Sequence, residues 1–510
     1  MMIKKLIPLT FATLFLAFSC SLEEEVLDES SGENLLEEPG IEMNLLAPVY
    51  SQLKTVIAGD LWALSEASSD EVVVPTRGLD WEDEGKWKQL HRHSWDAASG
   101  PILGLWTALE TGVSRANTGL LLLESLEGKR NPALTRSLRA ELRLLRALYC
   151  YWQYDCFRQI PVRDIEDEDY LTPPPVLKNQ EAFEWLESEL LSILPDMKPM
   201  VEQDYGRAAV DAARFLLAKL YLNAAAYTGQ PAWEQCLEQC AAIMNTGRYQ
   251  LADDYFHLFS VDNEVDNTEA IFVLRGSSQQ SLELFLGAAV TLHRNQRLGT
   301  SLWTFNGYCT VPDFFYTWDQ GDARFQDDRI RAATGANLGF LVGPQYHPDG
   351  SPVLTTGGEP LAYTVEVDLY NAMEWEGVRV LKYEPDPASG NLYFLGRCDF
   401  LLFRFADLHL MKTEVLLRLG RPQEALALAN ELREKRGVSG LNELTEDALL
   451  KERGFELYWE GWRRQDLIRF GRFAAGAWKD KQPVPEYRNV FPIPQTALDV
   501  NPNLQQNPGY

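Results

Sequence analysis

The sequence predicts a mainly α-helical protein made of tetratricopeptide-like helix pairs, with a loop-rich ligand-binding insertion and few short strands. Three observations support this prediction. Apolar residues recur at spacings of three and four in segments 134–152, 208–227 and 405–432. Alanines are frequent where paired helices would cross. Residues 281–400 lack a clean period and are rich in glycine, proline, aspartate and aromatics.

Residues 1–19 are predicted to be a signal peptide. Lys4 and Lys5 precede an apolar run of thirteen residues, from 6 to 18. That run is too short to span a membrane, which takes about 20 residues. A serine followed by Cys20 ends it and resembles a bacterial lipobox, so Cys20 is the predicted lipidation site.

Residues 20–40 are predicted to be a lipidated acidic tether, because they carry many glutamates and too little apolar surface to fold. The remainder is expected to form an N-terminal helical half, 41–275, and a C-terminal half, 276–510, which includes the insertion 281–400.

The net charge of −27 disfavours nucleic acid and polyanionic glycans as partners, because both are repelled electrostatically. Six cysteines follow Cys20 without CxxC spacing, and we interpret them as buried free thiols. His91 and His93 are expected to be hydrogen-bonded or solvent-facing. We therefore predict no metal site and no cofactor.

A long helix is predicted from Leu134, ending before Ile160-Pro161. Its buried stripe is formed by Leu138, Leu142, Leu145, Tyr149 and Trp152. Its other side carries arginines, which we interpret as a solvated face with counter-charges; they are Arg136, Arg139, Arg143 and Arg146.

An alanine-rich helix is predicted over 208–227. Another helix, 405–419, breaks at Gly420 and restarts after Pro422, as in a tetratricopeptide unit. Strands are predicted at 270–274 and 378–383.

Five blocks of sequence in order resemble the SusD/RagB family. They are Ala140–Tyr149 with Ile160-Pro161-Val162, Gly206-Arg207-Ala208, Arg404–Asp407, the run from Glu452 to Arg469, and Phe491–Pro494 with Gln506–Tyr510. The resemblance implies a SusD-like α/α superhelix in an outer-membrane lipoprotein that faces the cell exterior. It also implies capture of glycans, or in some members peptides, for a SusC-like TonB-dependent transporter.

Exposed loop aromatics are the expected glycan contacts, because sugar rings stack their C–H faces on aromatic side chains. Two loops supply candidates: Arg77, Asp80, Trp81 and Trp87 in the first, and Trp303, Tyr316 and Trp318, with Tyr346 further on, in the second. We expect both loops to face one shallow surface, with Trp81 near Trp303 or Trp318. Trp152, Trp459 and Trp462 are expected to be structural.

Three alternatives remain open: a peptide-binding uptake lipoprotein, a surface glycoside hydrolase and a purely structural lipoprotein. Glu452, Glu456 and Glu460 repeat at a spacing of four and could be drawn as paired catalytic carboxylates. We interpret them instead as a structural ion network with Arg453, Arg463 and Arg464. No catalytic residue is predicted.

Overall fold

The computed structural model describes residues 40–126, 128, 131–165, 172–201, 204–276, 288–300, 303–386, 388 and 396–510. Cys20 and all of the predicted tether except Gly40 lie outside these ranges. Residues Glu42–Tyr510 form one compact unit. None of the helices in the described part of the chain is both long and apolar enough to cross a membrane.

The structure confirms the mainly α-helical prediction. The helices before the insertion are α2 Ile41–Asn44, α3 Ala47–Val56, α4 Trp62–Glu66, α5 Lys86–Arg92, α6 Gly100–Ser125, α7 Pro132–Phe157, α8 Asn179–Ile193, α9 Val210–Leu222, α10 Ala224–Thr228 and α11 Trp233–Met244. Those within and after it are α12 Ala288–Thr291, α13 Pro312–Tyr316, α14 Arg331–Thr334, α15 Phe405–Arg418, α16 Pro422–Lys435, α17 Glu446–Leu457, α18 Arg463–Arg469 and α19 Gln495–Val500.

The strands are short and antiparallel. They are β1 Val72–Val73, β2 Gln159–Pro161, β3 Val176–Lys178, β4 Ala270–Leu274, β5 Cys309–Thr310, β6 Gln326–Asp327, β7 Leu338–Leu341, β8 Gly343–Pro344, β9 Ala362–Tyr363, β10 Arg379–Leu381 and β11 Phe400–Arg404. β10, β7 and β6 form one three-stranded sheet, and the other strands pair as β1–β5, β11–β4, β2–β3 and β8–β9.

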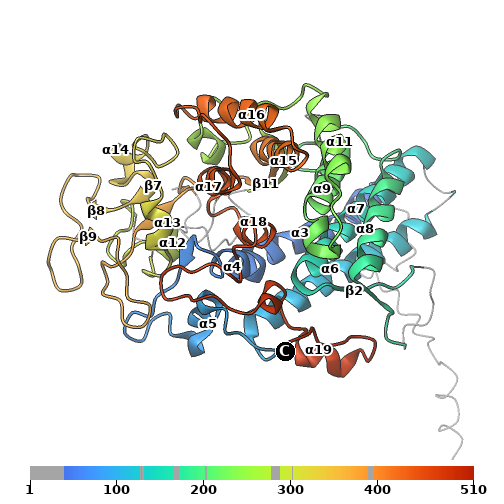
Figure 1. Ribbon diagram of the computed structural model, residues 1–510, viewed down its shortest axis with the longest axis horizontal. Coiled ribbons are helices and arrows are strands. Elements are labelled where there is room, and N and C mark those ends of the chain that lie inside the picture. Colours follow the sequence, from blue (N-terminus) through green and yellow to red (C-terminus); the bar gives the residue numbers. More distant parts are fainter. Residues whose placement is uncertain are drawn as a thin grey trace, which may run out of the picture. The chain divides into compact units, whose positions relative to one another are not determined.

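The helices pack as antiparallel neighbours, α6 on α7, α7 on α8, α9 on α11 and α15 on α16. In Figure 1 the cyan and green helices gather on the right, and the insertion, in yellow, lies on the left. α6 and α7 approach closely at Gly112, where a side chain would collide with the ring of Tyr149. A small residue is therefore required at this crossing.

The ends of α7 follow from local sequence. Asn131 caps its start by accepting hydrogen bonds from the backbone N–H groups of Ala133 and Leu134. Arg158 ends it with a positive φ of 58°, and Ile160-Pro161 continue as β2. On its polar side, Arg143 and Arg146 both pair with Glu189 of α8, which confirms the expected counter-charges for these two residues. Arg146 is buried against α8, so the prediction of a solvated face is wrong at this position.

The predicted helix over 208–227 is broken at Asn223, so that α9 and α10 are separate helices. The Asn223 side chain donates to the carbonyl of Lys219 at 2.9 Å and accepts from Arg469 at 3.1 Å. These competing bonds end the helix where the apolar pattern alone continues.

Residues near the start of the folded unit, around α4, are hydrogen-bonded to residues near 460. Trp62 Nε1 donates to the carbonyl of Trp459 at 3.0 Å. The Glu71 carboxylate accepts from the backbone N–H of Trp459, and that of Glu66 accepts from Gly461. Residues near 60–70 therefore complete their packing only with residues near 460.

Candidate ligand-binding surface

The first candidate loop is a tight turn in which Arg77 and Asp80 form an isolated β-bridge. The Arg77 side chain points inward and is only 7% exposed. Its guanidinium donates to the carbonyl of Glu376 at 2.7 Å and to that of Met373. Arg77 therefore fastens this loop to segment 364–377 and does not present its charge to solvent.

Trp81 connects the two candidate loops. Its indole Nε1 donates to the carbonyl of Phe305 at 2.8 Å, and its ring lies 5.4 Å from that of Tyr308. The ring is half-buried. The structure thus brings the turn at 77–81 against the loop that carries Trp303.

Trp303 is the most exposed aromatic on this side, with 70% of its surface accessible. The Arg297 guanidinium lies 5.4 Å from its ring centre. Nearby in sequence, Arg294 forms an ion pair with Asp80, and both side chains are about half exposed, 45% and 51%. An apolar ring and a set of charged hydrogen-bonding groups are therefore available together.

An open groove of about 560 Å³ continues from Arg297; its lining also includes Asn295, His347, Ser351, Pro352 and Leu354. Tyr346, 37% exposed, forms a β-bridge with Pro352 beside the groove. We call the combined face, made of Asp80, Trp81, Arg294, Arg297, Trp303, Tyr346 and the groove lining, the first surface. Sequence reasoning missed its basic members, although the polar run His293–Arg297 was a readable signal.

A polar cluster that runs from buried His293, Gln296 and Tyr363 out to Glu374 and exposed Thr356 supports the first surface. His293 Nε2 lies 2.9 Å from the Glu374 carboxylate, which also accepts from the hydroxyl of Thr356 at 2.8 Å. Burial lowers the pKa of His293. The Tyr363 hydroxyl donates to Gln296 at 2.6 Å and accepts from the backbone N–H of His293. These bonds fix the backbone from which Arg294 and Arg297 project.

Trp87 and Trp318 are placed differently from the expectation that they present stacking faces. Trp87 is 4% exposed and donates to Asp83 at 2.7 Å. Trp318 is 7% exposed, and its ring centre lies 4.2 Å from that of Phe455. Since other aromatic rings occupy their faces, neither offers a free face to a sugar. Tyr316 is 63% exposed but lines a separate groove, described below.

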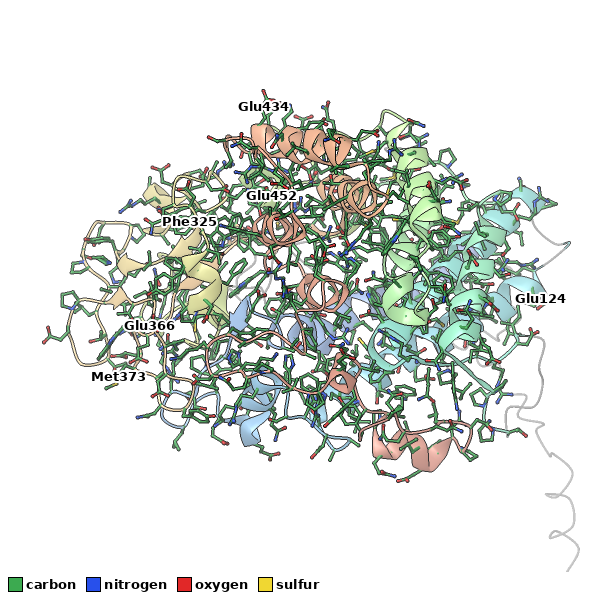
Figure 2. All side chains as sticks on the ribbon, viewed as in Figure 1. Glu124, Phe325, Glu366, Met373, Glu434 and Glu452 are labelled. Atoms are coloured by element: carbon green, nitrogen blue, oxygen red, sulfur yellow. The ribbon has the colours of Figure 1, made fainter. Side chains whose placement is uncertain are left out.

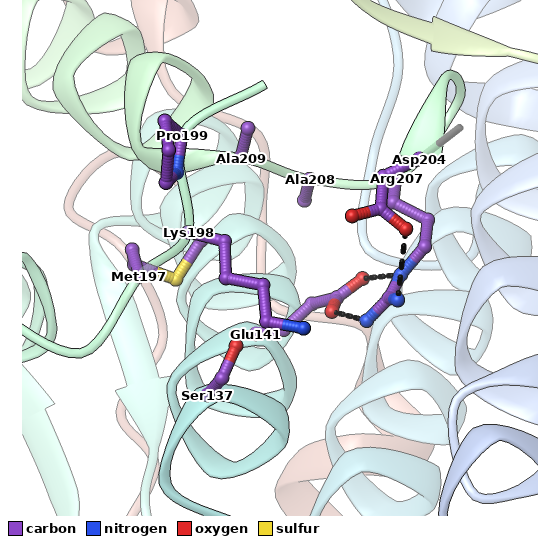
Figure 3. A pocket seen from close by; sticks show the side chains of 9 residues that line it. All are labelled: Ser137, Glu141, Met197, Lys198, Pro199, Asp204, Arg207, Ala208 and Ala209. Atoms are coloured by element: carbon purple, nitrogen blue, oxygen red, sulfur yellow. Dashed lines mark hydrogen bonds and ion pairs between the residues drawn. The ribbon is translucent and has the colours of Figure 1, made fainter. Parts of the chain in front are cut away.

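A small concavity between α7 and the start of α9 is structural. Glu141 and Arg207 form a bidentate ion pair across it (Figure 3). Tyr50 donates to the same carboxylate at 2.6 Å. Its volume of about 20 Å³ holds no more than a water molecule.

The glutamate row, with Glu452 and Glu456 on α17 and Glu460 just after it, is a buried ion network as predicted. The cations that neutralise it are not the predicted ones. Glu456 pairs with Arg324, Arg404 and Arg436. Glu452 pairs with Arg324 and Arg433, and Glu460 with Arg404 and Lys382. Figure 2 shows Glu452 in the centre of the view.

The three arginines expected in this network have other partners. Arg453 binds Asp407 and Asp466, Arg463 binds Asp70, and Arg464 binds Asp155. Asp70, Asp155 and Asp407 lie far away in sequence, and Asp466 lies on α18. The spacing of residues along α17 therefore could not identify these partners. Because every carboxylate of the row is neutralised and buried, none is available for acid–base catalysis.

The remaining sequence predictions on thiols, histidines and core tryptophans agree with the structure. All six cysteines after Cys20 are buried free thiols. His91 and His93 are buried and hydrogen-bonded to backbone carbonyls. Trp152, Trp459 and Trp462 are at most 5% exposed. Within the described ranges, no group of three or more histidine, cysteine or acidic side chains could hold a metal ion.

Comparison with known proteins identifies a matching family and several proteins of similar fold. A family model described as "SusD family" matches residues 245–510. The "Starch-binding protein SusD" of Bacteroides thetaiotaomicron is 27% identical over 84% of this chain and 82% of its own length. Among solved structures, "Surface glycan-binding protein A" of Bacteroides uniformis has a TM-score of 0.71 at 19% identity, covering 91% of this chain and 98% of that one. The same-named protein of Bacteroides thetaiotaomicron, solved in complex with laminarihexaose, has a TM-score of 0.70 at 17% identity, covering 91% and 98%.

Proposed function

The chain belongs to the SusD family, and on this basis we propose that it is a surface glycan-binding lipoprotein. Cys20 anchors it in the outer membrane, facing the cell exterior. It captures oligosaccharides or polysaccharides on the first surface and delivers them to a SusC-like TonB-dependent transporter. It does not cleave them.

The observation that carries the binding role is the exposure of Trp303 beside charged donors and acceptors. A 70% exposed indole costs hydration free energy unless it binds a partner, and a sugar's C–H face can cover it. Arg297 lies 5.4 Å from the Trp303 ring centre and can bond a hydroxyl at the edge of a stacked sugar. Asp80 and Arg294 form an ion pair on the turn that Trp81 joins to this loop, and they supply further polar groups on the same surface. An open groove, not a closed pocket, fits a chain that continues in both directions.

Neutral glucans are the ligand class that the relatives and the charge both favour. Relatives are named for binding starch and laminarin. The net charge of −27 repels polyanionic glycans at long range. We therefore propose a neutral glucan as the ligand, with a peptide as the alternative that the experiment must exclude.

The names of the relatives also support the prediction that this chain is not an enzyme, since they are named as binding proteins. Within the first surface, Asp80 is held in an ion pair with Arg294. In the polar cluster that supports this surface, Glu374 is held by His293 and Thr356. Carboxylates used in this way orient side chains instead of exchanging protons with a substrate.

The test is titration calorimetry on the protein lacking residues 1–20, with laminarin, starch and a peptide panel. Replacing Trp303 with alanine should weaken glucan binding about tenfold, because one stacking contact contributes about 1–2 kcal/mol. Leu122→Ala, at a side chain 37% exposed on α6, is the matched surface control and should bind normally.

Chromatography of the glucan after incubation should show an unchanged size distribution. Equal affinity of wild type and Trp303→Ala would reject the first surface as the site. Binding of peptides without any glucan, or a shortened glucan, would reject the proposed function.

A further inference from the structure

A second open groove, of about 740 Å³, lies at the edge of the insertion, outside the first surface. Tyr316 at the end of α13 forms one wall, and segment 364–376 and residues Lys479 and Asp480 form the others. Figure 2 shows two residues of that segment, Glu366 and Met373, at the lower left, on the side of the molecule that the insertion occupies. The linings of the two grooves share no residue.

Three exposed aromatic rings line this groove. Tyr316 is 63%, Tyr370 49% and Trp375 37% exposed. Each of the two tyrosine hydroxyls is held: Tyr316 donates to Glu366 at 3.0 Å, and Tyr370 accepts from Arg92 at 2.8 Å. Because these bonds fix the rings before any ligand arrives, little side-chain entropy is lost on stacking.

The polar part of the lining is acidic. The Asp368 carboxylate accepts from the backbone N–H groups of Tyr370 and Asn371, at 2.8 and 3.1 Å. Glu376 accepts from the backbone N–H of Asp368 at 2.9 Å. These carboxylates are held in place and keep lone pairs that can accept hydrogen bonds from hydroxyl groups.

The charge of the lining selects the ligand. Four carboxylates, Glu366, Asp368, Glu376 and Asp480, line the groove with one ammonium group, Lys479. Sulfated, phosphorylated or uronic acid chains would meet repulsion there. A neutral glycan supplies apolar faces for the rings and hydroxyl donors for the carboxylates.

Segment 364–377 separates the two surfaces. The Glu374 side chain bonds His293 and Thr356 below the first surface, whereas the next residue, Trp375, lines the second groove. One segment therefore contributes to both sites with neighbouring side chains.

We infer that this second groove, lined by Tyr316, Tyr370 and Trp375, is an independent binding site for a neutral glycan chain. The inference rests on the proposed function, since it assigns a second site for the same class of ligand. Two sites on one rigid body hold a polymer by two contacts, and the second contact forms at a high effective concentration. Polysaccharides would then be retained much longer than short oligosaccharides, which occupy each site singly.

The experiment compares four proteins: wild type, Trp303→Ala, the double variant Tyr370→Ala/Trp375→Ala, and the variant with all three changes. Calorimetry with maltoheptaose and laminarihexaose should show two bound molecules per wild-type chain for whichever oligosaccharide binds. Trp303→Ala should weaken one of these two sites about tenfold, the double variant should weaken the other about tenfold or more, and the triple variant should weaken both. Retention of the protein in gels that contain starch or laminarin should fall about tenfold or more both for Trp303→Ala and for Tyr370→Ala/Trp375→Ala.

Circular dichroism checks folding, and Leu122→Ala is again the control. If the double variant does not fold, Tyr316→Ala replaces it, because that side chain is mostly exposed at a helix end. Tyr316→Phe keeps the ring and should retain binding, which separates stacking from the Glu366 hydrogen bond.

The outcomes separate the two proposals. One bound oligosaccharide per chain, weakened in Trp303→Ala and unaffected in the groove variants, would refute the second site and leave the proposed function intact. Binding of no glycan by any of the proteins would refute both. Binding weakened only in the groove variants would establish this groove and reject the first surface.

Discussion

Trp303 and Trp318 lie in the same insertion, yet their side chains are 70% and 7% exposed. Trp318 is surrounded by Phe325, Phe340 and Tyr458 in addition to Phe455. Trp303 has the Arg297 guanidinium near one face. The two tryptophans therefore have different environments, although both lie in the same insertion, which has no clear hydrophobic period.

This difference gives a prediction for Trp318→Ala. Removing a buried indole leaves a cavity, so the free energy of unfolding should fall by about 3–5 kcal/mol. Chemical denaturation measures it, with Trp303→Ala as the matched control that should unfold close to wild type. A Trp318→Ala protein of full stability and reduced glucan affinity would show that this ring contacts ligand.

The sequence predicted which residue types occur at the proposed site, but not which of their side chains are exposed. The sequence predicted Trp81 and Trp303 as candidates, and the two loops that carry them do meet. It also suggested Arg77 and Trp87, which are buried. No local pattern marks burial in a loop without a period, because the covering side chains come from distant segments.

At the scale of secondary-structure elements, α17 shows how a row of like charges becomes stable inside a protein. The cations that neutralise Glu456 come from three places, Arg324 in a loop, Arg404 at the end of β11 and Arg436 just after α16. Burial alone would raise the pKa of Glu456, but these arginines hold it well below its usual range.

We expect Glu456→Gln to lower the free energy of unfolding at pH 7 by about 3–5 kcal/mol, because it leaves three buried arginines short of a counter-charge. A carboxylate whose pKa is depressed in the folded state contributes stability above its ordinary pKa of 4.5, and this contribution is lost as pH falls below that value. The difference between wild type and variant should therefore be largest near pH 7 and narrow in acid.

Denaturation curves at pH 7 and pH 4 measure this difference. Glu424→Gln on α16 is the control, because Glu424 and its partner Arg421 are exposed and should contribute little. Equal stability of wild type and Glu456→Gln at pH 7 would show that the network does not stabilise the fold.

Helices and strands with a strong pattern of apolar residues were predicted best. The strand predicted at 270–274 coincides with β4, and α15 and α16 begin at the predicted residues. The period could not show the break at Asn223, which depends on Arg469 246 residues away. Segment 364–376, which lines the second groove, has no period at all, so its aromatics were not recognised as a site.

At the scale of the whole molecule, the proposed attachment to the membrane depends on Cys20. Cys20→Ser should move the protein from the membrane to the soluble fraction, since anchoring strength follows the acyl methylenes that enter the bilayer. Fractionation of cells followed by immunoblotting measures it, and Ser21→Ala is the neighbouring control that should stay in the membrane. Retention of Cys20→Ser in cells that lack the transporter partner would contradict the lipid anchor.

The contacts that join α4 to the segment near 460 also delay the completion of folding during biosynthesis. Trp62 and Trp459 are 397 residues apart, and at about 5–20 residues per second the ribosome needs roughly 20–80 s to make the intervening chain. During that time the early helices lack the partners that would bury Trp62, Glu66 and Glu71. A chain that cannot finish folding early remains unfolded for longer. The proposed export through a secretion channel would require an unfolded chain.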